Sequence, residues 1–229
     1  MIEALRLGIV FCEATLWDGL DFAFEDGSAT VIVGPPSCGK TLLLSILRGE
    51  RKPDAGDVLV SGRSLYSTDR SAVTDLRAVS GFVPERFEAD GKLTVNNLFT
   101  RSSMVCHEID STEQKDRWER LLAMVGLTRK KDARLSTLSS SERVRAALAA
   151  ELLRSPKVLF MDSAVMMAGT PYTGMMGNLL RVLAGAGNIV LAAERKLPQG
   201  WEKFASQRKP KGPFFEYRLP PIVTEGESD

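Results

Sequence analysis

The sequence predicts an α/β protein in which a sheet core is interrupted by a long helical segment. A glycine-bounded loop at residues 34–41 follows an apolar, β-branched stretch at residues 28–33. Residues 93–155 carry helical patterns and no good strand, and strand-like stretches return at residues 157–161 and 188–193. At 229 residues the chain fits one large domain, or a core with a substantial insertion.

The segments before the loop are predicted as strands. Residues 5–11 and 20–25 have the composition of an antiparallel pair, and the second alternates apolar with polar side chains. The turn Asp26-Gly27 leads into the strand at residues 28–33. After the loop, the leucine-rich residues 41–49 are long enough to form a helix.

Shorter elements follow, and then the helical block. The composition indicates strands at residues 57–60 and 81–84, with a helix at residues 71–79 between them. Two capping boxes, Asp110-Ser111-Thr112-Glu113 and Ser139-Ser140-Ser141-Glu142, predict the starts of helices that run through Leu122 and to Leu153.

The chain ends in a segment of different composition. Residues 172–184 are predicted to form a last helix before the strand at residues 188–193. The tail, residues 197–229, is rich in proline and ends with acidic residues. We expect it to add at most an edge strand at residues 214–219.

The loop matches the phosphate-loop pattern G-x-x-x-x-G-K-[ST]. Between a strand and a helix, its backbone N–H groups and the helix N-terminus face one anion. Lys40 would reach the outer phosphates and the Thr41 hydroxyl would ligate Mg²⁺. The alternative is a glycine-punctuated turn that fits by chance. With both flanks correct, the pattern predicts a nucleotide site formed by Gly34, Pro35, Pro36, Ser37, Cys38, Gly39, Lys40 and Thr41.

Charge and composition exclude several classes of protein. The 30 basic residues nearly balance the 29 acidic ones, so nothing favours nucleic acid as a partner. The N-terminus has no basic region followed by an uninterrupted apolar run, and no stretch approaches the ~18 apolar residues of a membrane span. The three cysteines are scattered without metal or disulfide spacing, and we expect a cytoplasmic protein.

Several further stretches, in order and at matching separations, resemble the ATP-binding subunit of ABC transporters. The resemblance covers residues 5–196. After the phosphate loop, it is carried by GDVLVSG at residues 56–62, VPE at 83–85, LTVNNL at 93–98, LSSSE at 138–142 and SPKVLFMD at 155–162.

The resemblance implies a single nucleotide-binding domain over residues 1–229. Its fold would be a P-loop NTPase core with a mixed sheet, an N-terminal antiparallel β region and an inserted α-helical subdomain. The core would comprise about residues 1–85 and 156–196, the helical subdomain about residues 86–155, and the tail residues 197–229.

Four further residues are candidates for the ATP and Mg²⁺ sites. Asp162 ends a buried apolar strand, where a carboxylate is costly unless it meets a cation such as Mg²⁺, although it could instead cap a helix. Phe11 stands where the family stacks an aromatic ring on adenine, but a core phenylalanine is nearly as good an interpretation. Glu85 replaces the family's glutamine that senses Mg²⁺ and the attacking water. Ser139 belongs to the signature that contacts the nucleotide of the opposite subunit, and equally to a simple capping box.

The departures from the family pattern fall mainly on hydrolysis. Ser163 occupies the position of the catalytic glutamate, and loss of a positioned base costs ~10²–10⁴-fold in rate. Glu194 replaces the histidine that contacts the terminal phosphate. Glu85 and Glu194 are weak substitutes for the missing base. Serines replace the two signature glycines, and Gly169 replaces an aspartate at the dimer contact.

The resemblance implies an ATP-binding subunit that binds Mg-ATP at a dimer interface and drives a membrane permease, with impaired hydrolysis. It would form a homodimer, or a heterodimer with another ATP-binding subunit, at the inner face of the membrane. The permease would dock near Glu85 and residues 93–101. The alternatives are a regulatory nucleotide sensor or scaffold without a transport role, a working ATPase with unusual residues and, least favoured, a kinase.

Overall fold

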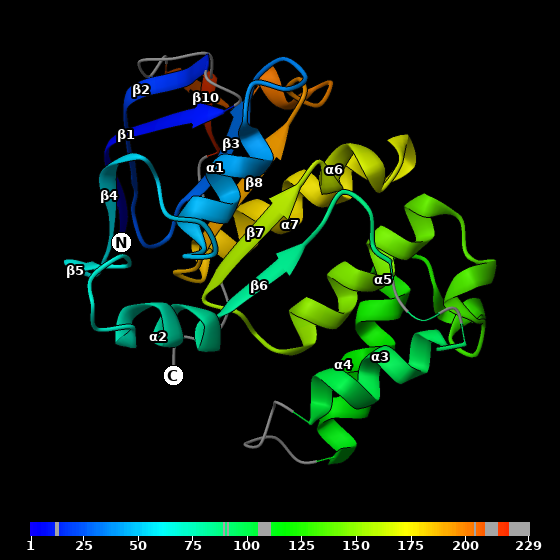
Figure 1. The fold of residues 1–229 in the computed structure, drawn as a ribbon. Helices are drawn as coiled ribbons and strands as arrows, with labels where there is room; N and C mark the ends of the chain where they lie inside the picture. The colour runs from blue at the N-terminus through cyan, green and yellow to red at the C-terminus, as the bar shows by residue number, and fades with distance from the viewer. Residues whose placement is uncertain are drawn as a thin grey trace, which may run out of the picture.

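A computed structural model describes residues 1–11, 14–88, 90, 92–104, 111–203, 205–208 and 215–219. Two sheets and a separate group of helices make up the fold (Figure 1). None of the described helices is long and apolar enough to cross a membrane.

The first sheet is antiparallel and confirms the predicted N-terminal β region. Its strands lie in the order β2-β1-β4-β5. The first two strands are longer than the sequence pattern indicated, because irregularities in their register interrupt the alternation without ending the pairing. The bounds are β1 Ile2–Phe11, β2 Ala14–Phe24, β4 Ala55–Val60 and β5 Arg63–Ser64.

The second sheet is mixed, as predicted, and has the order β6-β7-β8-β3-β10-β9. The first four strands are parallel, and β10 and β9 continue the sheet in antiparallel fashion. The bounds are β3 Ala29–Val33, β6 Ser80–Val83, β7 Val158–Asp162, β8 Ile189–Glu194, β9 Ser206–Arg208 and β10 Phe215–Leu219.

The prediction that the tail supplies an edge strand at residues 214–219 was wrong in its placement. β10 pairs with β3 on one side and with β9 on the other, so it lies inside the sheet. The short β9, which the sequence did not indicate, forms the edge. A strand's position in a sheet depends on its neighbours, which the tail's own composition does not reveal.

The helices divide between the sheets and a group of their own. The predicted helices after the phosphate loop, at residues 71–79 and before β8 are confirmed by α1 Lys40–Leu47, α2 Ser71–Val79 and α7 Thr173–Gly185, and a short helix, α6, covers Ala164–Met167. Between β6 and β7 lie α3 Val95–Ser103, α4 Ser111–Met124 and α5 Ser140–Leu153, which form a group to one side of the sheets in Figure 1, with α5 packed against β6. Single 3-10 turns cover Thr128–Lys130, Leu135–Thr137, Thr170–Tyr172 and Trp201–Lys203.

One of the two predicted capping boxes is confirmed. The Ser139 hydroxyl accepts from the backbone N–H of Glu142 at 3.3 Å, and the Glu142 carboxylate accepts from the backbone N–H of Ser139 at 3.0 Å. This reciprocal pair satisfies two otherwise free donors at the start of α5. The other predicted box needs Asp110, which lies outside the described residues.

The mixed sheet separates two hydrophobic clusters. Along β3, Val31 and Val33 face the cluster that includes α5 and α7, whereas Ile32 faces the cluster formed with α1 and the antiparallel sheet. This alternation is the two-residue period of a strand buried on both faces. All five residues of β3 are buried.

The parallel strands place the candidate site residues at one edge of the sheet. β8 pairs with β3 through Glu194 and Val33, and with β7 through Ala193 and Asp162. The carboxyl ends of β3, β7 and β8 therefore lie side by side, as does the end of β6 next to β7. Ligands of open α/β sheets bind at this edge.

Candidate nucleotide-binding site

The phosphate loop runs from β3 into α1 and needs glycine at its last turn. Gly39 has φ +91°, and a Cβ there would lie 2.6 Å from the Leu16 side chain and 2.7 Å from Trp17 Nε1. No other residue fits so close an approach at positive φ. The sequence pattern predicted the glycine, but not the contact with β2, because nothing local links positions 16 and 39.

Lys40 lies inside the loop. Its side chain is 8% exposed, and Nζ donates hydrogen bonds to the carbonyl oxygens of Gly34 at 2.7 Å and Pro35 at 2.8 Å. The Cys38 Sγ lies 3.6 Å from the same nitrogen. An ammonium has three donors, so a phosphate that reaches Lys40 has to displace at least one of these contacts.

The two predicted metal ligands from the phosphate loop and β7 are in direct contact. Thr41 Oγ1 donates a hydrogen bond to Asp162 Oδ2 at 2.7 Å, across 121 positions of sequence. Burial raises the pKa of Asp162, the hydrogen bond from Thr41 opposes this, and the nearby carboxylate of Glu85 adds to the rise. A bound cation would hold this carboxylate in its ionised form.

These oxygens suit Mg²⁺ bound to phosphates. Carboxylate and hydroxyl oxygens are the hard ligands that Mg²⁺ prefers, and it commonly takes one or two from the protein and the rest from phosphates and water. Among the described residues, no group of three or more His, Cys, Asp or Glu could hold a metal alone. Thr41 and Asp162 would hold the ion together with the phosphates of the nucleotide, and the metal would neutralise charge on those phosphates.

Ser163, in the place of the family's glutamate, follows Asp162 directly. It has φ +50° and is 7% exposed, and its backbone N–H donates to the Ala193 carbonyl at 2.7 Å. This hydrogen bond ties the turn after β7 to the end of β8. A serine hydroxyl is a poor acceptor of a proton at neutral pH, so the position offers no general base of its own.

The Glu194 side chain is fully buried beneath the turn after β7. Its Oε1 accepts a hydrogen bond from the backbone N–H of Val165 at 2.9 Å. Burial raises the pKa of Glu194 to about 8, hydrogen bonds from the backbone of Val165 and Met166 oppose the rise, and the carboxylates of Asp162 and Glu85 add to it. At neutral pH this group therefore carries its proton and supports the start of α6.

This buried carboxyl predicts a pH-dependent stability for the Glu194→Gln variant. The folded-state pKa lies above the ordinary value of 4.5, so the stabilising contribution of Glu194 is complete below about pH 4.5 and is lost as the pH rises through about 8. Glutamine keeps the acceptor for Val165 and does not ionise. Relative to wild type, the variant should gain on the order of 3 kcal/mol in unfolding free energy between pH 5 and pH 8.

Urea unfolding at both pH values measures this difference. The exposed Glu113 of α4 supplies the control, because Glu113→Gln measures the offset that comes from replacing a carboxylate on the surface of the protein. An offset of Glu194→Gln that is equal at pH 5 and pH 8 would show that folding does not raise the pKa of Glu194 into this range, and would contradict the prediction.

The fourth strand end brings in Glu85 and a residue that the sequence did not single out. Glu85, after β6, forms an ion pair with Arg195, after β8, with Nη2 and Oε1 3.2 Å apart. Both line a cavity of about 400 Å³, together with Ser163, Met166, Met167, Glu194 and Lys196. Arg195 was missed because the two residues are 110 positions apart and no local pattern connects them.

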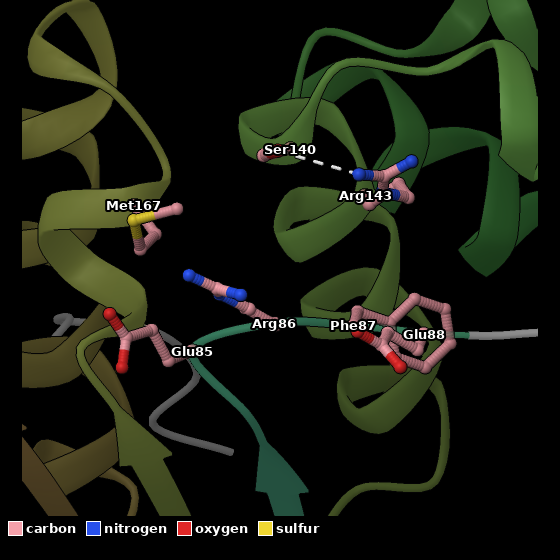
Figure 2. Close-up of a pocket in the computed structure, with 7 residues that line it drawn as sticks. All are labelled: Glu85, Arg86, Phe87, Glu88, Ser140, Arg143 and Met167. Carbon is pink, nitrogen blue, oxygen red and sulfur yellow. Dashed lines mark hydrogen bonds between the residues drawn. The ribbon is translucent and has the colours of Figure 1, made fainter.

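A second cavity, of about 290 Å³, lies beside the start of α5. Figure 2 shows the Arg86 guanidinium between Met167 and the Ser140–Arg143 pair of α5, with Glu85 on the same segment. Ser139 is held by its own capping box, and Glu142 is also held by Lys130 at 2.6 Å. The capping interpretation of Ser139 is thus confirmed, and its contact with a nucleotide remains a prediction.

Phe11, the predicted adenine-stacking residue, ends β1, and its side chain lies outside the described part of the structure. The predicted phosphate-loop residues, Asp162 and Glu85 lie at the carboxyl edge of the mixed sheet, whereas Ser139 lies at the start of α5. The structure combines a phosphate loop, the Thr41–Asp162 pair next to it and an inserted group of helices. This combination is typical of nucleotide-binding proteins with a phosphate loop.

Comparison with known proteins identifies the family. The family model for the ABC transporter matches residues 17–166, so this chain belongs to the ABC transporter family as a nucleotide-binding domain. Solved structures agree on the fold. An ATP-binding subunit of an ABC transporter superposes with a TM-score of 0.74 at 15% identity, over 88% of this chain and 82% of that one. A dimeric bacterial ABC transporter cassette superposes with a TM-score of 0.73 at 21% identity, over 86% of this chain and 88% of that one.

The curated relatives are transporter ATP-binding proteins. The L-cystine transport system ATP-binding protein TcyN of Escherichia coli is 30% identical over 80% of this chain and 75% of its own length. The methionine import ATP-binding protein MetN of Legionella pneumophila is 30% identical over 79% of this chain. An ATP-binding/permease protein of Mycobacterium tuberculosis is 29% identical over 81%. The chain spans 53% of MetN and 21% of the mycobacterial protein.

Proposed function

We propose that this domain binds Mg-ATP at an interface with a second nucleotide-binding domain, drives a membrane permease, and hydrolyses ATP slowly. The observation that carries the proposal is the turn after β7. Asp162 keeps its contact with Thr41, whereas the next residue is a buried serine without a base. Binding chemistry is retained where hydrolytic chemistry is missing.

The dimer and the permease are supported by the relatives. One similar solved cassette is described as dimeric, and the mycobacterial relative joins ATP-binding and permease parts in one protein. A partner domain would approach the start of α5, where Ser139 and the cavity beside Arg86 are placed. The proposed location is the cytoplasmic face of the membrane, reached through the permease.

The permease is proposed to dock on α3 and the segment that leads to it. Arg101 on this helix is exposed, and Phe99 is partly buried next to Trp118 of α4, with ring centroids 5.9 Å apart. A polytopic membrane protein that contacts this face would meet the exposed Arg101 beside partly buried apolar side chains. In a homodimer, two copies of this chain would bind the permease. In a heterodimer, one copy of this chain and a different nucleotide-binding domain would bind it.

Affinity capture from detergent-solubilised membranes of the source cell tests the partner. The tagged chain should bring down one polytopic membrane protein, and Arg101→Glu should reduce its recovery at least about fivefold, since reversal places like charges at the contact. Arg120→Glu, on exposed α4 surface, is the control. Recovery of no membrane protein, together with intact ATP binding, would favour the alternative of a regulatory sensor or scaffold.

A further inference from the structure

The ion pair between Glu85 and Arg195 joins two strand ends across the candidate site. β8 lies between β3 and β7 in the sheet, and the Gly34 backbone N–H donates to the Glu194 carbonyl at 3.3 Å. Arg195, the next residue, therefore leaves the sheet beside the phosphate loop on one side and Asp162 on the other. Its guanidinium crosses in front of β7 to reach Glu85.

The position suits recognition of the terminal phosphate. Lys40 would approach the phosphates from within the loop, and Thr41 and Asp162 would hold the metal. A triphosphate differs from a diphosphate by one more phosphoryl group, which has to extend beyond this point. The cavity of about 400 Å³ lined by Ser163, Arg195 and Lys196 lies at these strand ends. A guanidinium binds phosphate oxygens with two parallel donors.

The neighbouring acidic groups do not prevent this contact. The Glu194 carboxyl accepts a hydrogen bond from Val165 beneath the turn and is fully buried. The Glu85 carboxylate is the present partner of Arg195, but the side chains are 35% and 64% exposed. Exposed pairs of this kind are weak, so a phosphate with more charge can replace the carboxylate.

We propose that Arg195 binds the terminal phosphate of ATP, and that Glu85 holds Arg195 when that phosphate is absent. This inference rests on the proposed function and assigns the discrimination between ATP and ADP to one residue. Binding of the triphosphate would release Glu85. Residues 85–88 lead from β6 toward the helices and line the cavity beside α5 (Figure 2), so the release would be transmitted to the face proposed for the partner domain.

Binding of ADP and of a non-hydrolysable ATP analogue, measured by calorimetry, tests the assignment. Arg195→Ala should lower the affinity for the analogue at least about tenfold and change the affinity for ADP less than twofold. Arg195→Lys should lose less affinity for the analogue than Arg195→Ala does. Glu85→Gln should act in the opposite direction, strengthening the analogue up to about fivefold without changing ADP, because Arg195 is then unpaired.

Each binding experiment is run with Mg²⁺ and with EDTA. The changes in affinity caused by the Arg195 and Glu85 substitutions should persist in EDTA. A change that arises because Glu85 helps to bind the metal would appear only with Mg²⁺. The control is Arg63→Ala, which breaks another exposed ion pair, with Asp75 at 2.6 Å, and should change neither affinity.

The two proposals fail in different ways. If Arg195→Ala loses affinity equally for the analogue and ADP, or loses none for either, the proposed role of Arg195 is overturned. The proposed nucleotide site would still stand. An analogue affinity that falls in Glu85→Gln in EDTA would overturn the role of Glu85 as its holder. Absence of binding of both nucleotides to wild type would overturn the proposed function, and this inference with it.

Discussion

Replacement of Lys40 by alanine is expected to weaken binding of both ATP and ADP at least about a hundredfold. The ammonium is buried in the loop and would supply charge-assisted hydrogen bonds to the phosphates, each worth about 1.5–3 kcal/mol. A hundredfold change corresponds to about 2.8 kcal/mol. The loss should affect both nucleotides, unlike the selective effect expected for Arg195→Ala.

A second consequence follows from the contacts of Lys40 in the nucleotide-free loop. Its Nζ donates hydrogen bonds to the carbonyl oxygens of Gly34 and Pro35. The alanine variant therefore also loses the contacts that stabilise the conformation of the nucleotide-free loop. Lys157→Ala, an exposed lysine at the start of β7 and away from the carboxyl edge, is the matched control. Calorimetric affinities within threefold of wild type for Lys40→Ala would mean that this loop does not hold the phosphates.

Replacement of Ser163 by glutamate is expected to raise steady-state ATP hydrolysis at least about a hundredfold over a slow wild type. A positioned general base contributes ~10²–10⁴-fold. Ser163 follows Asp162 and is buried at φ +50°, so the new side chain would start next to the metal ligand without a change of backbone type. The neighbouring carboxylates of Asp162 and Glu85 would raise its pKa toward neutrality, where a base works best.

The matched control is Ser163→Gln, which has the same shape and cannot accept the proton. The double variant Ser163→Glu, Lys40→Ala separates turnover at this site from a contaminating ATPase. Equal rates for the glutamate and glutamine variants would show that a base is not what limits hydrolysis. Ordinary turnover by wild type that is lost in Lys40→Ala would instead establish the working ATPase and remove the claim of slow hydrolysis.

These expectations differ in how far the sequence supports them. The motif predicted Lys40 and Thr41 at a phosphate site, and the apolar strand ending in Asp162 predicted a carboxylate at the same place. The structure brings Thr41 and Asp162 to 2.7 Å. The capping box at Ser139 could also be predicted from the sequence, because a cap involves residues only three positions apart. The family pattern indicated Ser163 as a departure, and the structure places it in the turn between β7 and α6.

Tertiary structure alone decided the orientation of Glu194 and the partner of Arg195. From the sequence, Glu194 was a weak substitute base, and only the packing of α6 on β8 shows its carboxyl beneath the Val165 N–H. Arg195 gained a role because β6 and β8 both end at one edge of the sheet. Such contacts depend on strand order, which joins distant segments of the chain.

The sequence by itself therefore determined the phosphate-loop motif, the alternation of strands and helices, and the serine that follows Asp162. These features are encoded within a few residues, by side-chain periodicity, glycine positions and caps. The sheet order, the place of β10 inside the sheet and the Glu85–Arg195 pair were decided by tertiary structure. They arise from packing between segments far apart in the chain, where no local pattern specifies which side chains meet.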